Sequence, residues 1–145
     1  MYDFYLYSGR DLEEPTPYSN LQKSAQVVAK LCIDLPRNVN HQVFFDNWFT
    51  TIDLMRYLKA EGILAVGTIR SNRVQGCPLV GNKEIQKGNR GDLDYRIDKN
   101  SGIIIVKWLD NSVVQLCSNF VGVEPMDTIQ RWDKKEQARK DIQCP

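Results

Sequence analysis

The chain has 145 residues, which is long enough for one domain with a hydrophobic core. Its 42% hydrophobic and 26% charged residues are ordinary for a globular protein. The net charge of +1 excludes strong attraction of the whole chain to nucleic acid, so such a role would depend on local patches. Because no apolar run approaches the ~20 residues that a membrane span requires, we expect no membrane partner.

Four cysteines are spread along the chain, and none of them stands at the C-x-x-C spacing of a zinc site or a redox motif. They are Cys32, Cys77, Cys117 and Cys144. With a single histidine in the chain, a zinc site would need ligands from distant loops. We therefore interpret the cysteines as reduced thiols of an intracellular protein.

The first part of the chain predicts a strand followed by a helix. Residues 2–7 (YDFYLY) are aromatic and alternate well enough for a strand. Ser19 and Gln22 have the spacing of a capping box, and apolar residues follow at helical period. We expect a helix over about 20–34, before Pro36.

A strand, a helix and a second strand are predicted next. The apolar run 42–46 (QVFFD) is typical of a buried strand. Thr50 is expected to cap a helix that ends at Gly62, and residues 63–69 (ILAVGTI) form another buried run. Such a crossover makes a parallel pair of strands.

Residues 70–91 have little periodicity and a net charge of +4. This loop is either a solvated surface segment or a set of contacts to phosphates. Three strand patterns follow at 92–97, 103–109 and 112–118, with hairpin sequences between them. We expect an antiparallel meander, placed as an insertion on the α/β core. The charged tail over 124–145 is expected to be extended or weakly helical.

Asp46 is the sharpest candidate for chemistry, because it closes a strand that is otherwise apolar. In α/β sheets, ligands bind just beyond the carboxyl ends of the strands, where an aspartate can hold a divalent metal. An Asx-type bond to the following backbone is an equally good interpretation. No second carboxylate clearly faces Asp46, and Asp53 is better placed to interact with the dipole of the second helix.

Two sequence blocks resemble the piggyBac transposase family. Residues 43–51 (VFFDNWFTT) resemble the family's F-D-N-x-F-T-S block, and residues 66–73 (VGTIRSNR) resemble its G-T-x-R-x-N-R block at the same separation. Residues 2–9, 106–110 and 116–120 resemble further parts of the family. The resemblance therefore covers nearly the whole chain.

The resemblance implies an α/β fold with a partial ribonuclease H-like core and an antiparallel β insertion. Residues 1–70 would form the partial core, and residues 71–120 the basic loop and the three-stranded insertion. Residues 121–145 would be a charged tail that leads to C-terminal helices outside this chain.

The family uses three aspartates to hold two Mg²⁺ ions for DNA cleavage and strand transfer. Asp46 matches the second of these, as a catalytic metal ligand. The other two would lie before Met1 and beyond Pro145, so the isolated chain is expected to be inactive and to bind Mg²⁺ weakly or not at all. Arg70, Arg73 and Lys87 are the candidate contacts to the DNA backbone.

The implied partner is DNA, both transposon ends and target, bound through a longer parent protein in the nucleus. A homodimer is a further possibility. The alternative is a domesticated, non-catalytic descendant that binds DNA or nuclear partners. Without the resemblance, an unrelated α/β binding module also fits the sequence.

Overall fold

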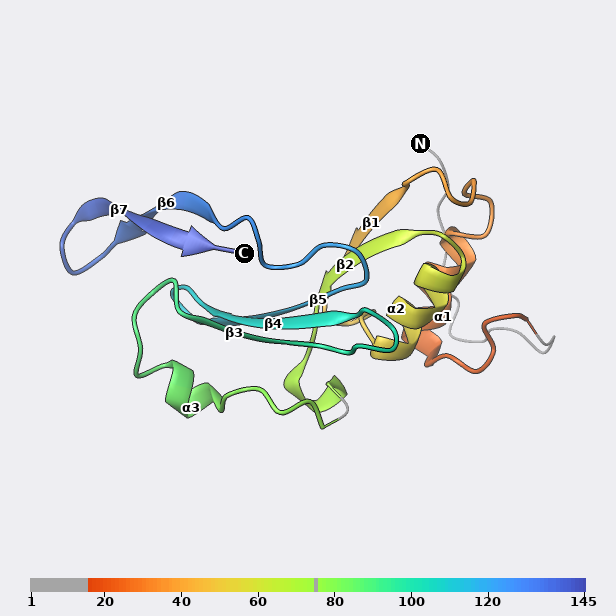
Figure 1. Ribbon diagram of the computed structural model, residues 1–145, viewed down its shortest axis with the longest axis horizontal. Coiled ribbons are helices and arrows are strands. Elements are labelled where there is room, and N and C mark those ends of the chain that lie inside the picture. The colour runs from red at the N-terminus through yellow and green to blue at the C-terminus, as the bar shows by residue number, and fades with distance from the viewer. Residues whose placement is uncertain (1–15, 75) are drawn as a thin grey trace.

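The computed structural model describes residues 16–74 and 76–145, so the strand expected at residues 2–7 lies outside the described part of the chain (Figure 1). None of the described helices is long and apolar enough to cross a membrane. In chain order, the elements are α1 (Lys23–Leu31), β1 (Gln42–Phe45), α2 (Ile52–Ala60), β2 (Leu64–Thr68), the 3₁₀ helix η1 (Ser71–Arg73), α3 (Asn82–Ile85), β3 (Leu93–Ile97), β4 (Ile104–Leu109), β5 (Val113–Ser118), β6 (Asp127–Asp133) and β7 (Ala138–Cys144).

Helix α1 is shorter than the sequence predicts, and the prediction of a capping box at Ser19 is wrong. The helix begins at Lys23 and has no side-chain cap bond at its N-terminus. The Ser19 hydroxyl instead accepts a hydrogen bond of 2.6 Å from the backbone N–H of Thr16. Ser19 therefore closes the turn before the helix, as serine hydroxyls often do in turns.

Helix α2 is capped at both ends by side-chain and backbone bonds. Its N-cap is Thr51 rather than Thr50, and the Thr51 hydroxyl accepts the N–H of Leu54 at 3.1 Å. At the other end, Gly62 has a φ of +70°, and the N–H of Ile63 bonds to the Leu58 carbonyl at 2.8 Å. This is a Schellman ending, so the prediction that Gly62 terminates the helix is confirmed.

Five strands form one sheet in the order β1-β2-β5-β4-β3. Strands β1 and β2 are parallel, as the strand–helix–strand pattern predicts, and Phe45 lies opposite Gly67. Strands β3, β4 and β5 form the predicted antiparallel meander. The meander is not a separate layer, because β5 pairs with the second edge of β2 and continues the same sheet.

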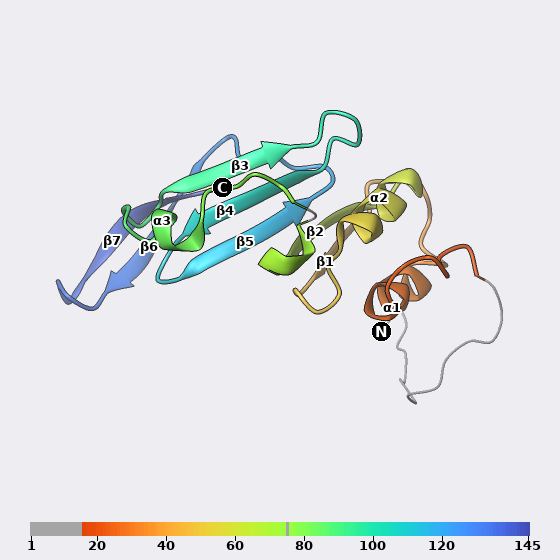
Figure 2. The ribbon, with the colours of Figure 1, turned by 90° about the horizontal axis from the view of Figure 1, so that it is seen from below.

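The main core lies between α1, α2 and one face of the sheet (Figure 2). Leu54, Met55 and Leu58 of α2 are completely buried, and Ala65 of β2 and Cys117 of β5 pack in the same cluster. Burial of a side chain of this size stabilises the fold by roughly 1.5–3 kcal/mol. The core therefore fixes α2 and β2, which flank the residues after β1.

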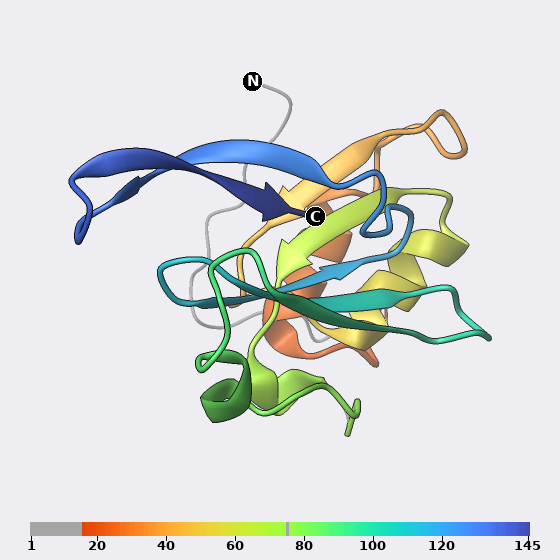
Figure 3. The same ribbon diagram turned by 60° about the vertical axis from the view of Figure 1, so that its left-hand side comes forward.

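The charged tail forms a β-hairpin, β6–β7, which runs out beyond the five-stranded sheet (Figure 3). Of the two expectations for this segment, the extended one is confirmed and the weak helix is wrong. Ile142 of β7 is 4% exposed, and the Trp108 indole N–H donates to the Gln143 carbonyl at 2.9 Å. The hairpin is docked on β4 through these contacts, which come from a distant part of the sequence.

Candidate functional site

The segment after β1 turns sharply at Asp46. The carboxylate is exposed, and its Oδ1 atom accepts the N–H of Trp48 at 2.8 Å. The Asp46 carbonyl accepts the hydroxyl of Thr50 at 2.8 Å. The Asx-type bond is therefore present. A carboxylate has about four lone-pair sites on two oxygens, so this one bond leaves capacity for a metal ion.

Gly67 on β2 allows this turn to lie against the neighbouring strand. A Cβ atom at Gly67 would lie 2.4 Å from the Thr50 hydroxyl oxygen and 2.8 Å from the Phe45 carbonyl oxygen. Both distances are shorter than real Cβ contacts, and the second involves backbone. The glycine of the G-T block therefore has a steric reason to be there.

Arg73, the last residue of η1, stabilises the same turn. Its Nη1 atom donates to the carbonyl oxygens of Asn47 (3.1 Å), Trp48 (2.7 Å) and Thr50 (3.1 Å). The side chain is half-buried. Arg73, a predicted DNA contact, thus has a structural role in shaping the segment that carries Asp46.

Arg70 lies on the outer side of the turn. Its Nε atom donates to the side-chain oxygen of Asn47 at 2.9 Å, and its guanidinium lies 5.2 Å from the centre of the Trp48 ring. An exposed cation–π contact is worth about 0.5–1 kcal/mol. These two contacts orient an exposed cation beside Asp46 before any ligand arrives.

A hollow of about 390 Å³ opens next to this cation, at the carboxyl ends of β1 and β2. Asn47, Arg70, Ser71, Asn82 and Gln115 supply its polar lining. The hydroxyl of Ser71 is held by the side chain of Gln115 at 2.9 Å. The lining suits an anionic ligand, because one cation and several neutral polar groups face it.

Lys87 does not belong to this cluster. It is exposed and follows α3, whereas Arg70 and Arg73 lie at η1, next to the turn after β1 (Figure 2). The structure therefore brings together three of the four predicted site residues, Asp46, Arg70 and Arg73. Within residues 16–74 and 76–145, no three Cys, His, Asp or Glu side chains are grouped so that they could hold a metal ion.

Asn119 positions β2 and was missed by the sequence analysis. Its side chain is 2% exposed, and its Oδ1 atom accepts the N–H of Ala65 at 2.8 Å. Its Nδ2 atom donates to the carbonyls of Ile63 (3.0 Å) and Met55 (3.2 Å). One buried amide therefore joins the end of β5 to β2 and α2. The signals in the sequence were its place directly after a strand and inside the block 116–120 that resembles the family.

Lys107 and Asp94, which lie opposite each other on β4 and β3, hold the linker that leads to α3. Lys107 is 5% exposed, and its Nζ atom donates to the carbonyl of Val80 at 2.5 Å. The Asp94 carboxylate accepts the backbone N–H of Val80 at 2.7 Å. This pair fixes the path of the basic loop after η1, a role that the sequence pattern did not predict.

Known proteins match large parts of the chain. Human piggyBac transposable element-derived protein 2 is 40% identical over 105 residues, which cover 72% of this chain and 18% of the relative. Human piggyBac transposable element-derived protein 3 is 37% identical over 101 residues, which cover 70% of this chain and 17% of the relative. The chain thus spans less than a fifth of the length of these relatives.

A solved structure, the cryo-EM structure of the piggyBac transposase synaptic complex with hairpin DNA, matches 89% of this chain and 26% of that chain. The TM-score is 0.52 and the identity is 21%, which shows a shared fold. The family model described as Transposase IS4 matches residues 1–144. The chain therefore belongs to this transposase family, and it is similar to its piggyBac-derived relatives over about 70% of its own length.

Proposed function

We propose that this chain is the central part of a ribonuclease H-like catalytic domain, whose parent protein uses Mg²⁺ to cut and join DNA. The single observation that carries the proposal is the place of Asp46. It lies just beyond the carboxyl end of β1, where β1 and β2 run parallel, and ligands of α/β sheets bind at such ends. Arg70 lies near Asp46 because its Nε atom donates to the side chain of Asn47, the next residue after Asp46.

The residues present fit one ligand of such a metal site. Asp46 offers an exposed carboxylate, and Mg²⁺ is usually bound by one or two carboxylates together with substrate phosphates and water. When bound, the metal would stabilise negative charge on the phosphodiester that is being cut. The chain's own contribution is to hold this carboxylate in place through Trp48, Arg73 and the close approach of Gly67.

The DNA backbone would contact the cations next to Asp46. Arg70 is oriented by Asn47 and Trp48 and faces the polar hollow, so it can meet a phosphate with little loss of side-chain freedom. Arg73 lies close by, and Lys87 would contact the backbone farther along. In this proposal the parent acts on transposon ends and target DNA in the nucleus, with a homodimer as a possible assembly.

The alternative is a domesticated descendant that binds DNA or nuclear proteins without catalysis. The observation in its favour is that the curated human relatives are named as transposable element-derived proteins. The two functions differ in whether the full-length protein cuts DNA. Activity of the full-length protein separates them.

The test is cleavage of a transposon-end DNA by the full-length parent in Mg²⁺, with Asp46→Asn as the variant. Asparagine can still accept the Trp48 N–H, so the turn is kept while the metal ligand is lost. We expect the unchanged protein to cleave and the variant to lose cleavage. Glu61→Gln, on the C-cap of α2, is the matched control and should cleave normally. Equal cleavage by Asp46→Asn would sink the catalytic proposal, and an inactive parent would favour the alternative.

A further inference from the structure

A second hollow of about 390 Å³ lies away from Asp46, where three segments meet. These segments are the loop after α3, the turn between β4 and β5, and the loop at the tip of the β6–β7 hairpin. They contribute Gln86, Arg90, Asn111, Lys134 and Lys135 to its lining. The tip lies at the end of the molecule that is opposite α1 (Figure 1). The hollow is thus built by the folded hairpin and is separate from the turn after β1.

The hairpin tip has a fixed shape. Oδ1 of Asp133 accepts the backbone N–H groups of Lys135 (2.8 Å) and Glu136 (3.3 Å). These bonds hold the pKa of Asp133 below its ordinary value. Lys140 pairs with both Asp133 and Glu136 across the hairpin. The loop is therefore ordered by backbone bonds that do not need the side chains of Lys134 and Lys135.

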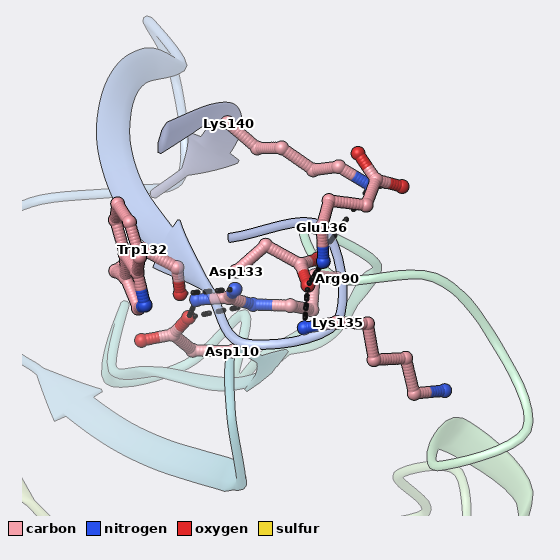
Figure 4. Close-up of polar contacts among 7 residues, drawn as sticks. All are labelled: Arg90, Asp110, Trp132, Asp133, Lys135, Glu136 and Lys140. Carbon is pink, nitrogen blue, oxygen red and sulfur yellow. Dashed lines mark hydrogen bonds and ion pairs between the residues drawn. The ribbon is translucent and has the colours of Figure 1, made fainter. Parts of the chain in front are cut away.

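An arginine and an aspartate anchor the tip to the sheet (Figure 4). Nη2 of Arg90 lies 2.5 Å from Oδ1 of Asp110, and Nη1 of Arg90 donates to the Trp132 carbonyl at 3.3 Å. Nε of Arg131 lies 3.5 Å from the second oxygen of Asp110. The two carboxylates that line the hollow, those of Asp110 and Asp133, are thus paired with cations, and so is Glu136 in the hairpin loop. Asp92, whose carboxylate lies against Gly88, accepts the backbone N–H of Asn89.

Lys134 and Lys135 remain outside these pairs. Both are exposed, and within the described part of the chain neither side chain makes a hydrogen bond or an ion pair. In Figure 4 the Lys135 side chain extends away from Asp110 and Glu136. Lys87 is also exposed, and its neighbours Gln86 and Gly88 line the same hollow. Two exposed lysines, Lys134 and Lys135, thus line the recess, and a third, Lys87, lies between two of its lining residues in the loop after α3.

We propose that this hairpin-tip site binds the sugar–phosphate backbone of duplex DNA at a second point, through Lys134, Lys135 and Lys87. The proposal rests on the proposed function. Lysine ammonium groups on an ordered loop suit phosphates, and their carboxylate neighbours are already neutralised by Arg90, Arg131 and Lys140. Such a contact positions DNA without reading its sequence. The hairpin-tip site would hold one phosphate of the duplex away from Asp46, while the site after β1 holds another.

The test measures binding of a fluorescein-labelled DNA duplex to the chain by fluorescence anisotropy, from 50 to 200 mM NaCl. Each phosphate contact contributes about 0.9 to the slope of log affinity against log salt. The double variant Lys134→Gln and Lys135→Gln should therefore lower the slope by about two. The Asp133 bonds go to backbone N–H groups, so the hairpin should remain folded in this variant.

The control removes the same charge from exposed lysines elsewhere, with Lys23→Gln and Lys99→Gln, and should leave the slope unchanged. An unchanged slope in the Lys134 and Lys135 variant overturns the inference. If only Arg70→Gln lowers the slope, the inference fails while the proposed function stands. Undetectable binding to DNA at 50 mM NaCl, or tighter binding to an RNA duplex of the same length, also overturns it. The Asp46 cleavage test decides the proposed function separately.

Discussion

Gly67 on β2 lies directly opposite Phe45 on β1, and a Cβ atom at Gly67 would come within 2.8 Å of the Phe45 carbonyl oxygen. The same atom would come within 2.4 Å of the Thr50 hydroxyl. The turn that carries Asp46 is thus pressed against β2 at a position where only a hydrogen atom fits. This close approach places Asp46, Arg70 and Arg73 in one cluster.

The first prediction follows from this contact. Gly67→Ala should lower the free energy of unfolding by about 1–3 kcal/mol, because backbone on β1 has to move to relieve the overlap. The urea midpoint of the chain, followed by far-ultraviolet circular dichroism, measures the change. Gly122→Ala is the matched control, since a Cβ atom there meets nothing within 4 Å. A Gly67→Ala variant as stable as the control would show that β1 and β2 are not this close.

A second prediction concerns the buried amide of Asn119. Asn119→Leu removes the partner of the Ala65 N–H and of the Ile63 carbonyl, and a second donor to the Met55 carbonyl of α2. Each buried group left without a partner costs about 1–3 kcal/mol, so we expect one of the largest losses of stability in the chain. The change in melting temperature measures it. Asn111→Leu, on the exposed turn after β4, should have little effect. If both variants have the same melting temperature as the unchanged chain, Asn119 does not join β5 to β2.

The third prediction is a dependence on pH that comes from Cys117. Burial of this thiol, with a smaller contribution from Cys77, raises its pKa to about 12 from the ordinary value of 9.0. The unfolded chain therefore loses this proton at lower pH than the folded chain does. It follows that the stability contributed by the protonated thiol is present below about pH 9 and is lost as pH rises from there towards 12.

Urea midpoints measured between pH 7.5 and 10.5 test this sign. The midpoint of the unchanged chain should fall above pH 9, and the fall should be smaller in Cys117→Val, whose side chain does not titrate. Cys144→Val is the control, because Cys144 is half-buried in β7. Identical pH profiles for Cys117→Val and the unchanged chain would contradict the burial of a protonated thiol at this position.

Much of the β1–α2–β2 unit is predictable from local sequence. The apolar runs at 42–46 and 63–69 and the glycine at position 62 locate two strands and a helix end to within a residue or two. The N-cap of α2 is harder to predict, because Thr50 and Thr51 are adjacent threonines and only tertiary packing decides which of them caps the helix. The Thr50 side chain is buried against Gly67, so Thr51 is the residue that caps the helix.

The β6–β7 hairpin was not predictable in the same way. Both of its faces carry charges, so the alternation of apolar and polar residues is weak. Its position depends on Trp108, Arg90 and Asp110, all of which precede the start of the hairpin at Asp127 by 17 residues or more. Local propensity carries no information on such contacts.

The residues of the candidate site were predicted from the sequence in part. A charged residue at the end of an apolar run pointed to Asp46, and the resemblance to piggyBac transposases added Arg70, Arg73 and Lys87. Sequence reasoning could not foresee that Arg73 would bond to three carbonyls of the turn, since this depends on the path of η1. Nor could it separate Lys87 from the other two cations, because the linker held by Lys107 lies between them.

Replacement of the Asp46 carboxylate by the thiol of cysteine is the sharpest test of whether Asp46 binds the metal ion. In the full-length parent, Asp46→Cys should lower the rate of DNA cleavage in Mg²⁺ by about a thousandfold, which corresponds to several kcal/mol of lost metal stabilisation. Mn²⁺, which accepts sulfur more readily than Mg²⁺, should restore part of the rate. Undiminished cleavage by Asp46→Cys in Mg²⁺ would contradict a role of Asp46 as a metal ligand.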